Sequence, residues 1–218
     1  MRRQNLDALS SLAQRVLTCL QTLYPQPKTN LEADTPWQLL VATILSAQCT
    51  DKRVNQQTPI LFARWQGPED MAQASLPELE CIIKPCGFYH NKAKNILATA
   101  KRIVSVYHGE VPHTLSELMT LPGVARKTAN VVLFGAFGRN EGLAVDTHVK
   151  RISFRLGLTL SHDPLRIEQD LMRVFPQEEW GNVNHRMVWF GRDVCTARSP
   201  HCSTCPLTAF CPRNGVAE

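Results

Sequence analysis

Four cysteines between residues 195 and 211 have the spacing of metal ligands. The pattern C-x6-C-x2-C-x5-C is formed by Cys195, Cys202, Cys205 and Cys211. One tetrahedral site of four sulfurs would use all of them and would fix a segment that is otherwise poor in apolar residues. Disulfides are the alternative, although a small loop closed by neighbouring cysteines is easily strained. Zinc and an iron–sulfur cluster both accept four thiolates, so the spacing predicts a metal site without identifying the metal.

A short glycine-containing turn leads into a predicted helix at residues 127–137. The sequence LPGVARKTAN places Pro122 and Gly123 at the end of one helix and Lys127 at the start of the next. Backbone N–H groups at such a helix start can bind a phosphate without any side chain. A plain connection between two helices would have the same pattern, so this motif alone leaves both interpretations open.

Lys127 is the unusual residue of this segment, because a cation in the first turn of a helix opposes the helix dipole. One interpretation is a charged lysine that reaches a phosphate or solvent. In the other, the dipole and partial burial disfavour the charged amine, and a neutral amine is a nucleophile that can form a Schiff base. Asp146 follows the apolar pair Ala144-Val145. Its carboxylate could stabilise developing positive charge or accept a proton from the amine, and it could also cap a helix that begins at Thr147.

Helical signals dominate the elements that must position these residues. Capping boxes are expected where Thr35, Ser75 and Thr114 are each followed three residues later by Gln or Glu. Alternating strand-like runs and hairpin dipeptides are missing from the sequence. We therefore predict an all-α fold of about ten helices joined by short polar loops. Helical patterns cover residues 53–65, 91–107, 127–137, 147–156 and 164–175.

The composition is that of an ordinary globular protein and sets wide limits on function. The chain has 218 residues, a net charge of +5 and 20% charged residues, which suits one large domain or two packed ones. Basic residues gather at 84–102 and 186–213, but solvated helix faces would give the same pattern. The four remaining cysteines are expected to be free thiols in a reducing cytosol. No apolar stretch is long enough to span a bilayer, so we expect a cytoplasmic protein without organellar targeting.

Four motifs occur together in one order: LSAQCTD, LPGVARKTAN, VDTHV and the four-cysteine run. Together they resemble the endonuclease III family of helix-hairpin-helix DNA glycosylases, over about residues 30–211. The resemblance implies a [4Fe–4S] cluster on the four cysteines. It also implies two helical domains with a DNA-binding cleft between them. These are a six-helix barrel with the helix-hairpin-helix motif at 28–138, and an iron–sulfur cluster domain made of 1–27 plus 139–218.

The resemblance also assigns roles to single residues. Lys127 matches the nucleophile of the family and Asp146 its catalytic aspartate. Gln48 matches a glutamine that fills the hole left by an extruded nucleotide, and Phe88 lies where the family inserts an apolar wedge. For Phe88 a place in the hydrophobic core is the alternative. Further DNA contacts are expected at Lys92, Gly123, Ala125, His148 and Arg151.

Ala125 departs from the family pattern, because the hairpin has a second glycine at this position. If the position needs a positive φ, alanine costs about 1–2 kcal/mol. If it needs close approach of the backbone, phosphate binding becomes weaker.

The function implied is base excision repair. The enzyme would remove oxidised or ring-damaged pyrimidines from duplex DNA through a lysine Schiff base and cleave the strand 3′ to the abasic site by β-elimination. Its partner would be double-stranded DNA with damaged bases or abasic sites, bound by a monomer at the nucleoid, and the cluster would be structural. A monofunctional mismatch glycosylase is one alternative, but those relatives generally lack the lysine that matches Lys127. A non-catalytic DNA-binding protein is another, and the joint presence of Lys127 and Asp146 argues against it.

Overall fold

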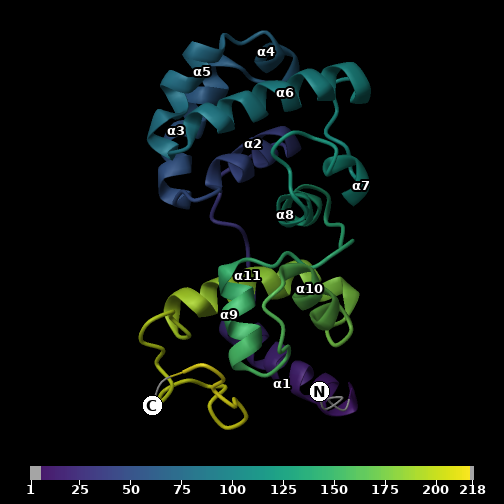
Figure 1. The fold of residues 1–218 in the computed structure, drawn as a ribbon, viewed down its shortest axis with the longest axis vertical. Helices are drawn as coiled ribbons and strands as arrows, with labels where there is room; N and C mark the ends of the chain where they lie inside the picture. Colours follow the sequence, from purple (N-terminus) through teal and green to yellow (C-terminus); the bar gives the residue numbers. More distant parts are fainter. Residues whose placement is uncertain (1–5, 217–218) are drawn as a thin grey trace. The chain divides into compact units, whose positions relative to one another are not determined.

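The computed structural model describes residues 6–216. Within that range the regular elements are eleven α-helices and two short 3₁₀-helices, and no strand occurs there (Figure 1). The all-α fold class expected from the sequence is confirmed. None of the described helices is long and apolar enough to cross a membrane.

The chain divides into two compact units. Residues 29–141 form one unit, which we call the continuous unit. The described parts of 1–28 and 142–218 form the other, which we call the split unit. Each unit has a hydrophobic core of its own.

The continuous unit is built around one almost fully buried helix, α2 (Pro36–Ser46). A helix that is apolar on all sides belongs inside a bundle, and α2 packs against α3, α6 and α8. The long helix α6 also packs against α4 and α5. The other elements of this unit are α3 (Asp51–Arg64), α4 (Pro68–Ala72), α5 (Leu76–Ile83), η1 (Lys84–Cys86), α6 (Tyr89–Tyr107), α7 (Leu115–Leu118) and α8 (Arg126–Phe137).

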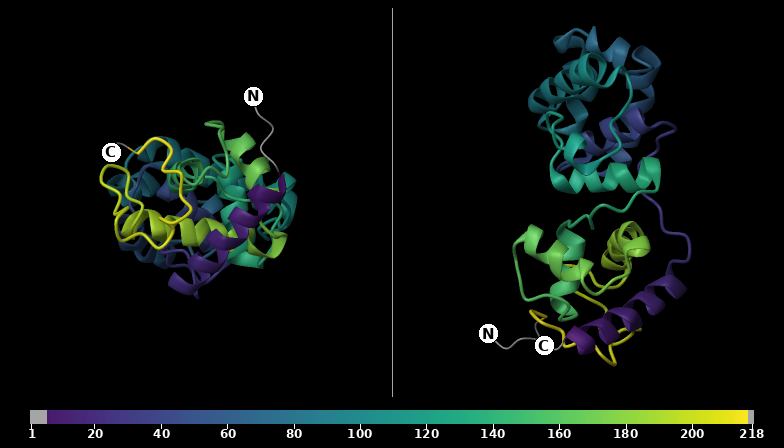
Figure 2. Two further views of the ribbon diagram at one scale, coloured as in Figure 1. Left: turned by 90° about the horizontal axis from the view of Figure 1, so that it is seen from below. Right: turned by 90° about the vertical axis from the view of Figure 1, so that its right-hand side faces the viewer.

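The split unit packs its first helix against a helix from the C-terminal half of the chain. Helix α11 (Trp180–Asp193) contacts both α1 (Leu6–Leu23) and α9 (Thr147–Arg155), and α9 contacts α10 (Pro164–Met172). A 3₁₀-helix, η2 (Gln177–Glu179), precedes α11. The irregular segment 194–216 runs beside α1 (Figure 2), where the Arg15 guanidinium lies 4.1 Å from the centre of the Phe210 ring.

Local capping explains where several helices begin. Thr35 accepts from the backbone N–H of Gln38, and Thr114 accepts from that of Glu117, which confirms the N-cap half of the predicted capping boxes. The Gln38 side chain accepts instead from the Asp34 N–H, and the Glu117 carboxylate from the Thr114 hydroxyl. Ser75 makes no side-chain cap, so that part of the prediction is wrong. Asp163 caps α10 by accepting from the N–H of Arg166 at 2.8 Å.

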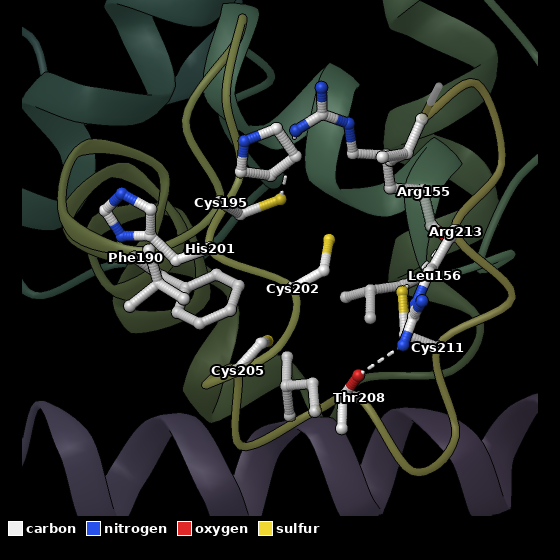
Figure 3. A pocket seen from close by; sticks show the side chains of 14 residues that line it. Arg155, Leu156, Phe190, Cys195, His201, Cys202, Cys205, Thr208, Cys211 and Arg213 are labelled. Atoms are coloured by element: carbon white, nitrogen blue, oxygen red, sulfur yellow. Dashed lines mark hydrogen bonds between the residues drawn. The ribbon is translucent and has the colours of Figure 1, made fainter. Parts of the chain in front are cut away.

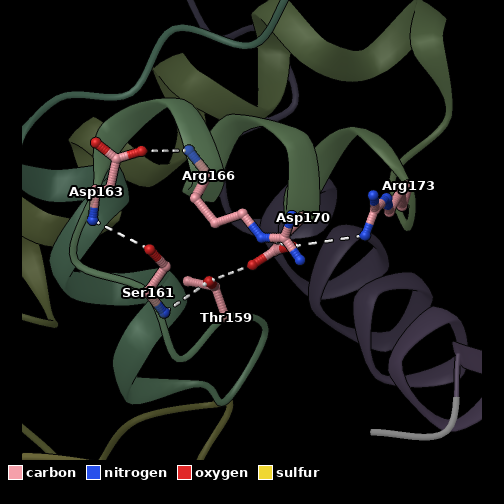
Figure 4. Close-up of polar contacts among 6 residues, drawn as sticks. All are labelled: Thr159, Ser161, Asp163, Arg166, Asp170 and Arg173. Atoms are coloured by element: carbon pink, nitrogen blue, oxygen red, sulfur yellow. Dashed lines mark hydrogen bonds and ion pairs between the residues drawn. The ribbon is translucent and has the colours of Figure 1, made fainter. Parts of the chain in front are cut away.

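A chain of side-chain contacts fixes the turn before α10 (Figure 4). The Asp163 N–H donates to the Ser161 hydroxyl, and the Ser161 N–H donates to the Thr159 hydroxyl. Thr159 in turn donates to the Asp170 carboxylate at 2.7 Å. The helix ends at Met172, three residues before the predicted end, and Phe175 lies in the core beyond it.

Candidate functional site

The turn between α7 and α8 is held against α6. Gly123 has φ +77, and a Cβ atom there would come within 2.8 Å of Asn95 on α6. The Thr99 hydroxyl, also on α6, donates to the Pro122 carbonyl at 2.8 Å. Position 123 therefore needs glycine for two reasons, a left-handed backbone and a close approach.

Ala125 is the N-cap of α8 and has extended backbone angles, φ −81 and ψ 167. Because this φ is negative, the cost that alanine would have at a positive φ does not arise. The departure from the family pattern at this position therefore causes no backbone strain. Unlike Thr35 or Asp163, Ala125 has no side chain that could accept from the first-turn N–H groups. A helix start without a side-chain cap is suited to an external anion.

Lys127 is the second residue of α8, and its side chain is exposed. The partial burial expected for it is not observed. What remains of the expected environment is the place of Lys127 in the first turn of α8.

Gln48 and Phe88 share two unusual features within the continuous unit. Both have backbone angles in the left-handed region, with φ of 52 and 48, and both side chains are exposed. Phe88 is 64% exposed, so the alternative of a core aromatic is excluded. Non-glycine residues in this region cost about 1–2 kcal/mol and are found where the surrounding structure imposes them, often at ligand-binding sites.

Lys92 is not on the basic surface of α6. Its side chain is 5% exposed, and Nζ donates to the carbonyls of Leu45 and Cys86, both at 2.8 Å. The expectation that Lys92 contacts DNA is corrected, because its ammonium is bound inside the protein. Neighbouring Lys94 and Lys101 are exposed on the same helix.

Asp146 caps α9 in the split unit, so the capping role expected from the sequence is confirmed. Its Oδ1 atom accepts from the N–H of Val149 at 2.8 Å, and the residue is half-buried. The cap fixes the orientation of the carboxylate. Lys127 belongs to the continuous unit and Asp146 to the split unit.

His148 and Arg151 lie side by side on α9. One guanidinium nitrogen of Arg151 lies 3.2 Å from Nδ1 of His148. Burial lowers the pKa of His148. Asp146 raises this pKa, whereas the nearby cations Arg151 and Arg192 lower it further, and the net effect favours the neutral imidazole. The Arg151 guanidinium donates to the carbonyls of Gly191 and Cys195. Arg151 therefore holds the start of the cysteine segment.

Gly191 was not identified from the sequence, although the packing of α11 on α9 depends on it. A Cβ atom at this position would lie 2.5 Å from Nδ1 of His148 and 2.8 Å from Arg151. A glycine within a helix gives no sequence signal of this kind, because its role is set by the neighbouring helix.

The four cysteines of the C-x6-C-x2-C-x5-C pattern line one pocket of the split unit (Figure 3). Leu156, Phe190 and Leu207 are among its apolar walls. Burial raises the pKa of the Cys205 and Cys211 thiols. A ligand that binds thiolates must therefore offset the cost of their deprotonation, as metal binding does.

Arg155 connects α9 to the first cysteine. Its guanidinium donates to Sγ of Cys195 at 3.3 Å and to the carbonyls of Thr196 and Ala197 at 2.7 and 2.9 Å. No motif in the sequence pointed to this residue. Hydrogen bonds to ligand sulfurs are a known means of tuning metal sites.

The donor set of this pocket fits an iron–sulfur cluster. A [4Fe–4S] cluster is held by four cysteine thiolates. Four thiols around one pocket with apolar walls match that requirement.

Comparisons with known proteins agree with this geometry. Residues 41–177 match the family model of HhH-GPD superfamily base excision DNA repair proteins, and residues 195–211 match that of the iron–sulfur binding domain of endonuclease III. The endonuclease III of Synechocystis sp. is 53% identical over 200 residues, which cover 92% of this chain and 91% of that protein.

Two solved structures are similar over nearly the whole chain. A non-covalent endonuclease III–DNA complex has a TM-score of 0.86 and 44% identity, and covers 92% of this chain and 95% of its own. A trapped endonuclease III–DNA covalent intermediate, an estranged-adenine complex, has a TM-score of 0.88 and 42% identity, and covers 97% of each chain. The sequence motifs, the all-helical fold, the four-cysteine pocket and these similarities lead to one conclusion: the chain belongs to the endonuclease III family of base excision DNA repair proteins.

Proposed function

We propose that Lys127 is the nucleophile with which this chain removes damaged pyrimidines from duplex DNA. As a member of the endonuclease III family the chain is a bifunctional DNA glycosylase and abasic-site lyase with a [4Fe–4S] cluster. The observation that carries the assignment is the exposed amine of Lys127 in the first turn of the helix that follows the hairpin. A related enzyme has been trapped as a covalent intermediate with DNA, and such an intermediate requires a nucleophile.

We propose that the continuous unit binds the DNA backbone first. The turn at residues 121–125 and the start of α8 would hold a phosphate through backbone N–H groups, with Gly123 permitting the close approach. Gln48 and Phe88 would then occupy the gap left by the extruded nucleotide. Oxidised, ring-saturated or fragmented pyrimidines stack and pair poorly, so their extrusion costs least.

The chemistry would follow in two steps. The Lys127 amine attacks C1′ of the sugar, the C1′–N bond to the base breaks, and the base leaves with the electrons of that bond. The C1′–O4′ bond then opens: O4′ leaves with the electrons of that bond and takes a proton, while the lysine nitrogen forms the C=N bond of the Schiff base. The Schiff base makes a C2′ proton acidic, and removal of that proton expels the 3′ phosphate by β-elimination. Asp146 would stabilise positive charge on the sugar and accept a proton from the amine.

The proposed ligands of the cluster are Cys195, Cys202, Cys205 and Cys211. When bound, the cluster cross-links these four positions and orders the segment 194–216. Arg155 and Arg151 attach the same segment to α9. We also propose that the protein acts on DNA as a monomer, in the cytoplasm at the nucleoid.

The decisive experiment is a Lys127→Ala substitution. Borohydride should trap wild-type enzyme on a duplex with one oxidised pyrimidine, and the variant should give no trapped complex while DNA binding stays nearly unchanged. Lys52→Ala is a matched control, because Lys52 is also exposed and is the second residue of its helix, α3. A trapped complex that persists in Lys127→Ala would place the nucleophile elsewhere.

A further inference from the structure

The buried amine of Lys92 joins the ends of two helical elements. Its Nζ donates to the carbonyl of Leu45 in the last turn of α2 and to that of Cys86 at the end of η1, both at 2.8 Å. The last carbonyls of a helix have no partner within the helix, and a cation is favoured there. One side chain thus caps both elements. Their two carbonyls cannot lie farther apart than the length of two hydrogen bonds.

The two capped elements lead directly into the two candidate DNA-inserting residues. Gln48 follows Leu45 by three residues, and Phe88 follows Cys86 by two. Both have φ in the left-handed region, so the chain turns sharply at each of them. Burial raises the pKa of the Cys86 thiol to about 11, and the nearby Cys49 thiol acts in the same direction. Residues of the two loops therefore also lie close together at these thiols.

A lysine is a costly choice for this position. Lys92 is 5% exposed, and burial lowers its pKa because the charged form is poorly solvated. Methionine has a similar length and would fill the space without this cost, as apolar replacements of buried charges often do. What methionine could not do is hold two carbonyl groups at a fixed distance. The bridge is therefore the property that distinguishes lysine here.

We propose that Lys92 is a positioning residue that holds the loop at 47–50 close to the loop at 87–88, a role that rests on the proposed roles of Gln48 and Phe88. It acts through these loops and does not touch DNA. Both side chains must enter the base stack for one extrusion event. If the loops move independently, each must lose its own conformational freedom at that moment, whereas a fixed bridge removes this cost in advance.

The test is Lys92→Met, measured by single-turnover base excision on a duplex with one oxidised pyrimidine. Extrusion is followed in parallel through the fluorescence of a 2-aminopurine next to the lesion. We expect both rates to fall about tenfold, a coupling within the range seen for residues that share a network. Unchanged excision and extrusion rates would overturn the proposal.

A second background separates positioning from general damage to the fold. In the variant Gln48→Ala/Phe88→Ala there is nothing left to position, so adding Lys92→Met should slow excision little further. An equal slowing in both backgrounds would overturn the proposal. If Gln48→Ala/Phe88→Ala by itself excises like the wild type, the proposed role of these two residues fails, and that outcome is distinct from a failure of Lys92 alone.

A stability control uses Ile103→Val, which trims a fully buried side chain of the same helix, α6, away from both loops. Excision by this variant should stay near the wild-type rate even with a lowered melting temperature. If Lys92→Met does not fold, Lys92→Gln replaces it, because its shorter side chain retains a donor but cannot span both carbonyls. Lys92→Gln should slow excision in the wild-type background but little further in Gln48→Ala/Phe88→Ala. An equal slowing in both backgrounds would count against the proposal.

Discussion

At the scale of single residues, several cationic side chains are bound inside the protein. Lys92, Arg155 and Arg186 are at most 7% exposed, and each donates to main-chain carbonyls. Arg186 also pairs with Glu179 at 2.6 Å. Half-buried Arg151 likewise donates to main-chain carbonyls. The basic stretches of the sequence therefore overstate the charge available to DNA, since part of the net +5 is used to hold loops and helix ends.

Asp146 combines a capping role with a proposed catalytic one, and two substitutions can separate them. Asp146→Asn keeps a good N-cap, so stability should change little while excision is nearly lost. Asp146→Ala removes cap and carboxylate together and should cost about 1 kcal/mol of unfolding free energy in addition. Urea unfolding and single-turnover excision measure the two effects. If Asp146→Asn kept both the stability and the turnover of the wild type, the carboxylate would have no chemical role.

At the scale of elements, the continuous unit uses the same turn design twice. Gly87 separates η1 from α6, and Gly123 lies between α7 and α8, with φ of +67 and +77. The first turn carries Phe88 and the second leads to Lys127. In both cases a glycine with a positive φ lies two or three residues before the first residue of a helix. Residues 79–98 and 115–135 thus share an arrangement in which a turn with a positive-φ glycine joins two helical segments.

The hairpin turn can be tested with three substitutions. Gly123→Ala should cost at least about 1–2 kcal/mol from the left-handed backbone, and more from the collision with Asn95. Gly138→Ala is the matched control, because Gly138 has φ +65 but open space around it, so only the backbone cost applies. Ala125→Gly should change stability by well under this amount, because Ala125 is extended. Gly123→Ala should also weaken DNA binding, measured by fluorescence anisotropy at constant salt. Equal effects of Gly123→Ala and Gly138→Ala on both properties would show that contact with Asn95 is unimportant.

At the scale of the whole molecule, two separate cores support a division of tasks. The continuous unit contains Lys127, Gln48 and Phe88, whereas the split unit contains Asp146 and the cysteine pocket. The core of the split unit includes Phe190 and Leu207, which also line the pocket. A change at the pocket should therefore affect the core of its own unit first.

Loss of the cluster should destabilise one unit much more than the other. Cys202→Ser is expected to lose the iron and the visible absorbance of the purified protein, while Cys81→Ser, at an exposed position outside the pocket, should retain both. Hydrogen exchange in Cys202→Ser should rise in the segment 194–216 and in α9 and α11. Protection of α2 and α8 should remain. A similar loss of protection in α2 would mean that the two cores are not independent.

The sequence by itself determined the features that depend on near neighbours. The cap at Asp146, the turn at Gly123 and the four-cysteine set each involve residues a few positions apart, and their chemistry can be read without the fold. Tertiary structure decided the features that depend on distant partners. Lys92 binds a carbonyl 47 residues away and Arg155 a sulfur 40 residues away, so neither role is visible locally. Phe88 could have been a core residue until its exposure was known. Helix α11 was not among the predicted ranges, because its glycines and asparagines are poor helix formers and its stability comes from packing on α1 and α9.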